Sequence, residues 1–385
     1  MLKRVSIQNF KSLKDVTLDL QKINLLIGPN NSGKTNFLKS FAFLKEVLSS
    51  KEVDGLDSFV YNKKKEDIIM RLVFDNEFIE AFSGKFEHNI VARTYYEEDG
   101  GAFYKRDKPV LSTSVAFSDV IDGYTEGEIA HEIETIDFDS IKYYTGDIKI
   151  YKTDSGKISK PSPVGDENSS VDSDASNIIN FLDLMLGKYR KTILSKIEQD
   201  MERCVPEFDE INLDNVTPTQ EMRKLYGEGK VFKRLGLTNN KQGITYWADE
   251  LSEGTLYFLA LLCIINQPEP PKLLLLEEPE KGIHPRRIRE VIDLIFKLIE
   301  EKDIQIILTT HNEHVLDEFA TRPESVFVFD KDEEGATYVR NLQTDIIEPT
   351  NKQNEELGLD PIDLTSNLSE NWLYGLLGGV PPMAE

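Results

Sequence analysis

The sequence predicts an α/β fold with a mixed sheet, an appended antiparallel β-sheet and a helical lobe. Three observations lead to this prediction. A glycine-rich turn at 28–35 joins an apolar strand to a helix, and the apolar runs at 273–276 and 304–308 each end in polar residues. Residues 66–151 contain short runs of alternating polarity, separated by Gly and Asp. The first two predict strands that alternate with helices, and the third predicts antiparallel strands.

The composition is ordinary for a folded chain, with 39% hydrophobic and 29% charged residues. No run approaches the roughly 20 apolar residues that a membrane helix needs, and residues 1–4 lack the apolar core of a secretion signal. Cys204 and Cys263 lie far apart, which gives neither a disulfide framework nor the spacing of a thiolate metal site. We therefore expect a cytoplasmic protein with no membrane partner.

The net charge of −23 argues against nonspecific nucleic-acid binding by the whole surface, because that affinity comes from cations that displace counterions at phosphates. The net charge does not exclude a local basic surface, since residues 221–241 hold six Lys or Arg against two acids. Five of these cations are Arg223, Lys224, Lys230, Lys233 and Arg234. They form either a DNA or partner surface or an ordinary solvated face.

The first half of the chain is expected to be rich in strands. Apolar and polar residues alternate from 5 to 20, which predicts a β-hairpin ahead of the buried strand at 23–27. A helix with an apolar stripe is expected to begin near Asn36. The antiparallel sheet is predicted from three alternating runs, at 68–74, 78–86 and 129–138.

A change of composition marks the middle of the chain. Residues 152–175 are rich in Ser, Asp, Pro and Gly, which predicts a surface loop that buries too little apolar area to order itself. One or two helices are expected from 178 to near Pro206, and their apolar pattern is too short for a long coiled coil. Residues 207–248 form a mixed segment that contains the basic cluster.

The last third of the chain returns to alternating helices and strands. A helix is expected to open at Asp249, and a second helix carries proline in its first turn at Pro285. Strands are expected at 273–278 and 304–308, and a closing hairpin is expected around Gly335.

A phosphate-binding loop, or P-loop (the Walker A motif), is predicted at Gly28-Pro29-Asn30-Asn31-Ser32-Gly33-Lys34-Thr35. The motif lies between a strand and a helix, which is the context that it requires. Backbone N–H groups over Asn30, Asn31, Ser32 and Gly33 would cradle phosphate oxygens at the start of the helix. Lys34 would reach the β- and γ-phosphates, and the Thr35 hydroxyl would bind Mg²⁺.

Tandem carboxylates follow the four leucines at 273–276. Glu277 and Glu278 stand at the carboxyl end of this strand, where open α/β sheets bind ligands. Two adjacent carboxylates at a buried strand end are costly unless something positive lies between them. A magnesium ion and an attacking water would supply that reason.

The chain resembles the ABC-type ATPases of the AAA family, the SMC, RecF and OLD-like group of bacterial defence proteins. The resemblance covers 1–48 and 244–330. It rests on Ile7-Gln8-Asn9-Phe10-Lys11-Ser12, the P-loop, Leu-Ser-Glu-Gly-Thr at 251–255, Glu-Glu-Pro-Glu at 277–280 with Gly282-Ile283-His284-Pro285, and Thr310-His311.

In proteins of this group two subunits share each ATP site, so the resemblance implies a homodimer or a higher homo-oligomer that binds ATP and Mg²⁺. Glu277 would hold the metal ion, and Glu278 would act as the general base in the Walker B motif. His311 would contact the γ-phosphate. Ser252 and Gly254 in the signature motif would close the site of the other subunit, because a helix N-terminus favours an anion. Without that role, Ser252 would be an ordinary N-cap, and His311 would be a core histidine.

Several features depart from the group's usual pattern. Glu277 stands where Asp is commoner, and no metal-sensing glutamine can be placed, because residues 66–243 separate Lys34 from Ser252. That interval is too long for a transporter ATPase, and the missing coiled coil disfavours a chromosome-tethering SMC protein. Some 55 residues follow Asp330, too few for a Toprim nuclease domain.

These observations predict four segments. An N-terminal ATPase lobe with the P-loop and the antiparallel insertion spans 1–151, and a linker with a helical lobe spans 152–243. A C-terminal ATPase lobe with the signature, the Walker B motif and the switch histidine spans 244–345. The tail, 346–385, would dock on the body or on a partner.

Three functions fit the sequence. The first is an ATP-hydrolysing dimer that gates a separate effector protein encoded nearby, in bacterial anti-phage defence. The second is a RecF-like ATP-dependent DNA-binding repair protein, which would use the basic cluster. The third is a scaffold that ATP holds together, with incidental hydrolysis.

Overall fold

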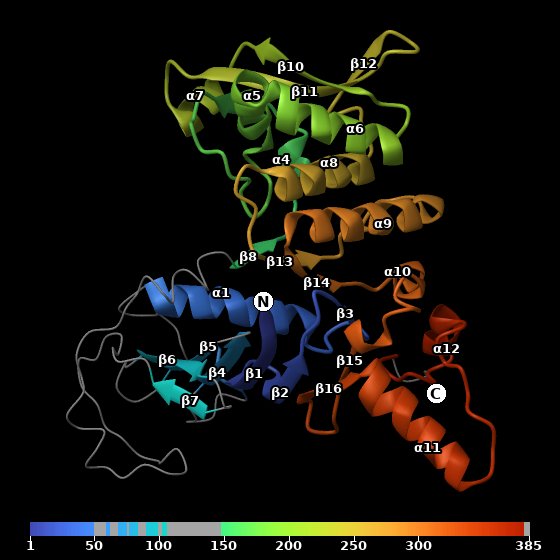
Figure 1. The fold of residues 1–385 in the computed structure, drawn as a ribbon. Helices are drawn as coiled ribbons and strands as arrows, with labels where there is room; N and C mark the ends of the chain where they lie inside the picture. Colours follow the sequence, from blue (N-terminus) through green and yellow to red (C-terminus); the bar gives the residue numbers. More distant parts are fainter. Residues whose placement is uncertain are drawn as a thin grey trace. The chain divides into compact units, whose positions relative to one another are not determined.

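The structure is a computed structural model that describes residues 1–49, 59–61, 68–74, 77–83, 90–98, 102–105 and 148–380 (Figure 1). The chain forms two compact units. Unit 1 combines Met1–Ile148 with Phe319–Glu385, and unit 2 is Lys149–Glu318. Of the described helices, none is long and apolar enough to cross a membrane.

Unit 1 contains the antiparallel sheet that the alternating runs predict. Its strands lie in the order β2-β1-β4-β5-β6-β7, and each neighbouring pair is antiparallel. The strands are β1 (Leu2–Phe10), β2 (Leu13–Asp19), β4 (Ile68–Phe74), β5 (Glu77–Ser83), β6 (Ile90–Glu98) and β7 (Ala102–Lys105). The predicted hairpin is confirmed as β1 and β2, in which Val5 and Ile7 are buried. The third predicted run, at 129–138, lies outside the described residues.

A second set of strands in unit 1 carries the P-loop. The predicted strand is confirmed as β3 (Ile23–Ile27), which is buried throughout. It pairs in parallel with β15 (Val326–Lys331), and β15 pairs antiparallel with β16 (Thr337–Asn341), so the predicted closing hairpin is confirmed. Helix α1 (Lys34–Ser49) starts earlier than predicted, because the carbonyl of Gly33 already accepts a helical hydrogen bond from Phe37 N, at 2.9 Å.

The C-terminal segment completes unit 1. It contains η4 (Pro323–Ser325), η5 (Leu342–Ile347), α11 (Glu348–Glu356) and α12 (Leu368–Leu373). Trp372 is buried, and its Nε1 donates to the carbonyl of Gly379 over 3.1 Å. Gly379 N in turn donates to Asp330 Oδ2 on β15, at 3.2 Å. These contacts attach the end of the described chain to the body of unit 1.

Unit 2 contains the strands that carry the tandem carboxylates. Strands β13 (Leu273–Glu277) and β14 (Gln305–Thr309) pair in parallel, as the sequence predicts, and β8 (Ile148–Tyr151) flanks β13. Helices α8 (Glu253–Asn266), α9 (Pro285–Lys302) and α10 (Glu313–Asp317) accompany them. Helix α8 starts later than the predicted Asp249, because a turn precedes it: Trp247 N donates to Glu250 Oε2 over 2.8 Å.

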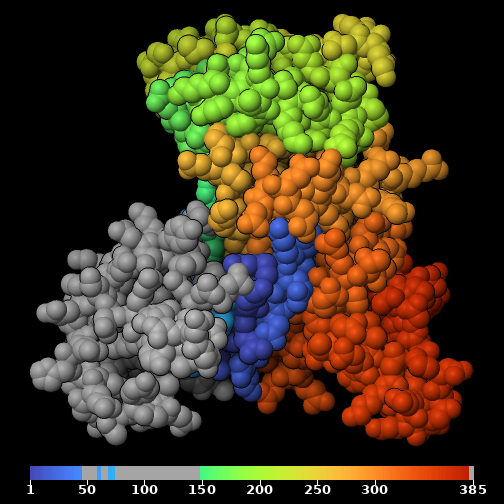
Figure 2. Space-filling model, in the orientation of Figure 1, coloured from blue at the N-terminus to red at the C-terminus, as the bar shows by residue number. Residues whose placement is uncertain are grey.

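The remainder of unit 2 forms one packed body, drawn in green to yellow in Figure 2. Its helices are α4 (Ser155–Ile158), α5 (Ile178–Lys188), η3 (Arg190–Leu194), α6 (Ser195–Cys204) and α7 (Gln220–Tyr226). The sequence did not predict the antiparallel sheet beside them, which contains β9 (Ser162–Val164), β10 (Glu210–Val216), β11 (Val231–Asn239) and β12 (Ile244–Trp247).

The prediction that 152–175 is a loop unable to order itself is wrong in part. The segment contributes α4 and β9, and it buries Ile158, Val171 and Ala175. Val171 N donates to the buried Gln267 side chain at the end of α8, at 3.0 Å. A few apolar residues spaced through a polar stretch therefore suffice to attach it to the α8 side of the unit.

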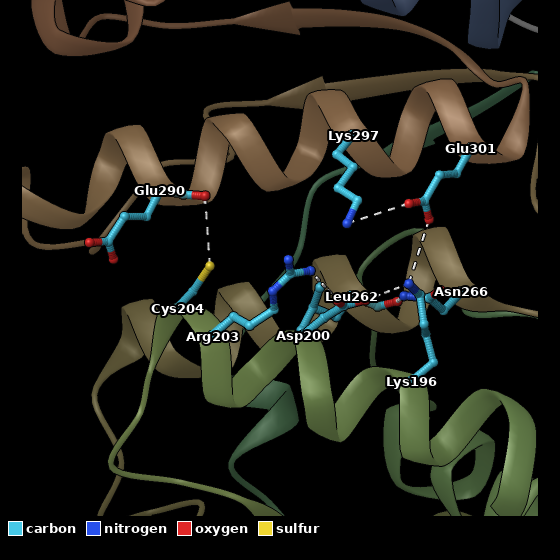
Figure 3. A network of polar contacts seen from close by, with 9 residues as sticks. All are labelled: Lys196, Asp200, Arg203, Cys204, Leu262, Asn266, Glu290, Lys297 and Glu301. Atoms are coloured by element: carbon cyan, nitrogen blue, oxygen red, sulfur yellow. Dashed lines mark hydrogen bonds and ion pairs between the residues drawn. The ribbon is translucent and has the colours of Figure 1, made fainter.

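Polar contacts join α6 to α9 (Figure 3). The Asp200 carboxylate on α6 is almost fully buried and lies 3.8 Å from Lys196 Nζ. Lys196 also pairs with Glu301 on α9, at 3.5 Å. The Cys204 thiol donates to the carbonyl of Glu290 on α9, at 3.7 Å, and burial raises the pKa of this thiol to about 11. The network makes α6 and α9 one assembly within unit 2.

Candidate nucleotide site

The P-loop of unit 1 encloses its own lysine. Ser32 and Lys34 are buried, and Lys34 Nζ donates to the carbonyls of Gly28 at 2.8 Å and Pro29 at 3.0 Å. Thr35 follows in the first turn of α1. A buried ammonium held by backbone oxygens is a preformed positive centre, and the N–H groups at the start of α1 are oriented as an anion requires.

Two glycines make this loop compact, and a residue that the sequence did not single out lies behind it. A Cβ on Gly28 would collide with the carbonyl of Phe329, and a Cβ on Gly33 would collide with Thr337. Thr337 Oγ1 lies 2.8 Å from both Ser12 Oγ and Ser32 O. Thr337 therefore fixes the backbone of the P-loop from β16, and no local motif indicates this contact.

In unit 2 the tandem carboxylates have different surroundings. Glu277 ends β13, and its side chain, 16% exposed, pairs with Lys152 Nζ at 2.8 Å. Glu278 has a φ of 49°, a conformation that is uncommon for residues other than glycine and is found at functional sites. Its N–H donates to Thr309 O at 3.0 Å, which ties it to the end of β14.

The structure brings Glu278 and His311 together. His311 Nε2 lies 3.6 Å from Glu278 Oε1, and the two side chains are 37% and 38% exposed. Because β13 and β14 are parallel neighbours with Glu277 opposite Thr309, the residues that follow both strands meet at one edge. A carboxylate and an imidazole at this separation can act on the same water or phosphate oxygen.

Beneath that pair lies a buried carboxyl group that the sequence did not single out. Glu280 is 6% exposed, and its Oε1 accepts a hydrogen bond from Thr310 Oγ1. Burial raises the pKa of Glu280 to about 7, and the nearby charge of Glu278 adds to the rise. The Glu-Glu-Pro-Glu motif could have indicated this residue, since Glu280 follows the tandem carboxylates after a single proline.

The signature residues both have a role within their own subunit. Ser252 is exposed and is the N-cap of α8, with its Oγ accepting from Thr255 N at 3.1 Å. Gly254 is buried, and a Cβ there would collide with the carbonyl of Gly282 in the turn after Glu280. The turn that carries the signature is therefore packed against the turn that follows the tandem carboxylates.

Three cations of the basic cluster are paired inside unit 2, and one of them, Arg223, lies 4.0 Å from Glu228 Oε2. Lys233 Nζ lies 2.5 Å from Asp183 Oδ1, and Arg234 pairs with Asp214 at 3.0 Å. The Arg234 guanidinium also lies over the ring of Trp247, 3.6 Å from its centroid. These pairs neutralise part of the charge that a DNA surface would use.

The donors present fit a magnesium nucleotide. The described residues contain no group of three or more His, Cys, Asp or Glu that could hold a metal ion by themselves. Magnesium is commonly held by one or two protein oxygens together with substrate phosphates, and each unit offers an oxygen of this kind: the hydroxyl of Thr35 in unit 1 and the carboxylate of Glu277 in unit 2. The glycine-walled P-loop suits the phosphates.

Comparisons with known proteins agree with this description. The profile of the family described as "AAA domain, putative AbiEii toxin, Type IV TA system" matches residues 23–88 and 120–317, well over half of the chain. The chain is also 27% identical over 111 residues to the energy-coupling factor transporter ATP-binding protein EcfA2 of Bacillus cereus. That match covers 29% of this chain and 35% of the transporter protein, about a third of the relative's length.

Solved structures with a similar fold are SMC head domains. One is an SMC head bound to the C-terminal winged-helix domain of ScpA, with a TM-score of 0.53 and 14% identity, covering 88% of this chain and 96% of that one. Another is the Pyrococcus furiosus SMC head with an extended coiled coil, bound to the C-terminal domain of ScpA. Its TM-score is 0.51 at 14% identity, and the match covers 93% of this chain and 99% of that one. The predicted ABC-type head fold is confirmed.

Proposed function

The chain belongs to the AbiEii-type AAA-domain family of ATP-binding ABC and SMC-like ATPases, and from that premise we propose that it hydrolyses ATP at a site shared by two copies. Lys34 and the surrounding N–H groups of one copy hold the phosphates. The signature turn of the second copy closes over the γ-phosphate. Hydrolysis then removes the group that holds the two copies together.

The observation that carries the enzymatic part is the Glu278–His311 pair. The two side chains are 3.6 Å apart, and each is more than a third exposed. In the proposed reaction the Glu278 carboxylate accepts a proton from the attacking water, and His311 donates a hydrogen bond to the γ-phosphate. Thr35 and Glu277 would hold magnesium, which would supply positive charge to the phosphate oxygens. Lys34 stabilises the negative charge that builds up between the β- and γ-phosphates.

The exposed Ser252 supports the part of the proposal that concerns two copies. Its hydroxyl stands at the N-terminus of α8, a helix of 14 residues whose first N–H groups favour an anion. The SMC heads named above share the fold of this chain.

We propose further that this ATP cycle switches a separate effector protein in bacterial defence. The support is the family description, which names a toxin of a type IV toxin–antitoxin system. The effector would recognise the ATP-bound pair and lose its contact when the copies separate.

Phosphate release from the purified protein tests the enzymatic part. Glu278→Gln keeps the size of the side chain and removes the base, so we expect turnover to fall by about 100-fold or more, into the range of general-base losses. Glu333→Gln is the matched control, because Glu333 is exposed in the turn between β15 and β16. Equal rates for the parent and Glu278→Gln would overturn the proposal.

The mass of Glu278→Gln in solution tests the shared site. We expect the variant to form a dimer, with twice the mass of one chain, when ATP and magnesium are added. With ADP it should remain a monomer, because only ATP supplies the γ-phosphate that joins the copies. A mass that is the same with and without ATP would contradict the proposed dimer.

A further inference from the structure

A buried carboxyl group lies in the same turn as the proposed catalytic base. Glu280 follows β13 in the same turn as Glu278 and is 6% exposed. Its Oε1 accepts from Thr310 Oγ1, while its Oε2 has no hydrogen-bond partner among the described residues. Burying a carboxyl group with an unsatisfied oxygen is costly. Packing alone therefore does not explain why a glutamate occupies this position.

Thr310 links Glu280 to the segment that carries His311. Its Oγ1, which donates to Glu280, also accepts from Asn312 N at 2.9 Å. Asn312 is the N-cap of α10, with its Oδ1 accepting from His314 N at 2.9 Å. The backbone of His311 is thus held on both sides, by Thr310 before it and by the start of α10 after it.

The turn that carries Glu278 is held in a similar way. Glu278 N donates to Thr309 O, and Glu278 O accepts from Lys281 N, each at 3.0 Å. Glu280 O accepts from Ile283 N, also at 3.0 Å. The Glu280–Thr310 hydrogen bond is therefore a buried side-chain link between two tight segments, one carrying Glu278 and the other carrying His311.

We propose that Glu280 and Thr310 are a positioning pair, which sets the distance and direction between Glu278 and His311 from below. This inference rests on the proposed function for its effect on turnover, but its structural part concerns this chain alone. Neither residue touches the reacting atoms. The side-chain hydrogen bond holds the ends of β13 and β14 so that the carboxylate and the imidazole face the same point.

The chain provides a matched pair of threonines for the test. Thr309 and Thr310 are adjacent and both buried, but Thr309 Oγ1 has no hydrogen-bond partner among the described residues. Thr310→Val should lower kcat by about 10- to 100-fold, the range seen when a group that orients a functional residue is lost. Thr309→Val should keep the parent's kcat. The Kd for ATP should stay within about twofold of the parent's in both variants, since the phosphate-binding loop is unaltered.

Conservative replacements separate positioning from packing. Thr310→Ser and Glu280→Gln keep the donor and the acceptor, so both should retain most of the parent's kcat. Glu280→Leu removes the acceptor and should behave like Thr310→Val. Equal kcat values for Thr309→Val and Thr310→Val, or equal losses in Glu280→Gln and Glu280→Leu, would overturn the positioning role.

A measurement without nucleotide keeps the inference independent of the ATPase proposal. The protein has five histidines, so the ¹³Cε1 resonance of His311 can be assigned by its loss in His311→Gln. We expect this resonance to move in Glu280→Leu and to stay in place in Glu280→Gln, with thermal unfolding recorded for each variant. An unmoved resonance in a folded Glu280→Leu variant would refute the positioning pair. If the parent does not hydrolyse ATP, the proposed function falls, and this resonance still decides the inference.

Discussion

The P-loop and the edge that carries Glu277, Glu278 and His311 are built on opposite principles. In the P-loop the functional cation is buried, and Lys34 is held by the carbonyls of its own loop. At the carboxylate edge Glu278 and His311 are more than a third exposed, and hydrogen bonds underneath hold them in place. The first region is defined by backbone shape, whereas the second is defined by contacts between strands that lie far apart in sequence.

Replacing Lys34 would test the first half of this comparison most strongly. Lys34→Met keeps the length of the apolar stem and removes the buried ammonium, so we expect ATP affinity to fall by about 100-fold, equivalent to roughly 3 kcal/mol. Lys39→Met, on the exposed face of the same helix, is the control. Calorimetric titration with ATP measures both. If the two variants bound ATP equally well, the P-loop would not be the phosphate site.

Adding a methyl group at Gly254 tests whether the signature glycine serves its own subunit. Because a Cβ would collide with the carbonyl of Gly282, Gly254→Ala should destabilise the nucleotide-free protein by about 1–3 kcal/mol, the usual cost of overpacking. A Cβ at Gly187 on α5 meets no atom within 4 Å outside its own stretch of helix among the described residues, so Gly187→Ala should leave the unfolding temperature unchanged or raise it. Thermal unfolding compares them. If Gly254→Ala unfolds like the parent and loses only its ATP-dependent mass change, the role within the subunit is wrong.

The buried carboxyl group of Glu280 gives the carboxylate edge a pH dependence. The pKa of Glu280 is raised to about 7 from an ordinary value of 4.5, so between these values the folded chain binds more protons than the unfolded one. The free energy of unfolding therefore falls as pH rises through this window, by up to a few kcal/mol. Glu280→Gln cannot titrate, so its stability relative to the parent should be greater at pH 8 than at pH 5. Urea unfolding at both pH values measures this, and a constant difference would contradict the shift.

The ion pair of Lys152 with Glu277 should matter least for stability. The Lys152 side chain is 75% exposed, and exposed pairs contribute about 1 kcal/mol or less. Lys152→Met should therefore change the urea midpoint only slightly. A loss as large as that of Gly254→Ala would show that Lys152 supports the end of β13 far more than its exposure suggests.

Much of the fold could be predicted, because its signals are local. The apolar runs that became β3, β13 and β14 are short, buried and bounded by turn residues, and the P-loop spacing is legible in eight consecutive residues. The sheet of β9 to β12 was missed, since its strands are polar and interrupted and are defined only by pairing with β11. Two helix starts were misplaced by a few residues: helical hydrogen bonding already begins at Gly33 ahead of α1, whereas a side-chain-capped turn at Trp247 delays α8.

The sequence predicts which residues would carry the chemistry at the candidate site but does not predict which residues hold them in place. Thr337 contacts the P-loop although it lies some 300 residues later in the sequence. Lys152 pairs with Glu277 although the whole of the 155–272 segment separates them in the sequence. Glu280 and Thr310 meet only because β13 and β14 are neighbours. Such contacts depend on tertiary structure and have no fixed spacing that a motif could record.

A complementation assay tests the central claim, a site shared between two copies, most directly. Lys34→Met disables one half of each site, and Ser252→Arg blocks the other half, so neither variant alone should hydrolyse ATP. Mixed in equal amounts with exchange of copies, half of the dimers contain one intact site, and the mixture should recover about a quarter of the parent's rate. A mixture as inactive as its two components would show that both halves act within one copy, which contradicts the account.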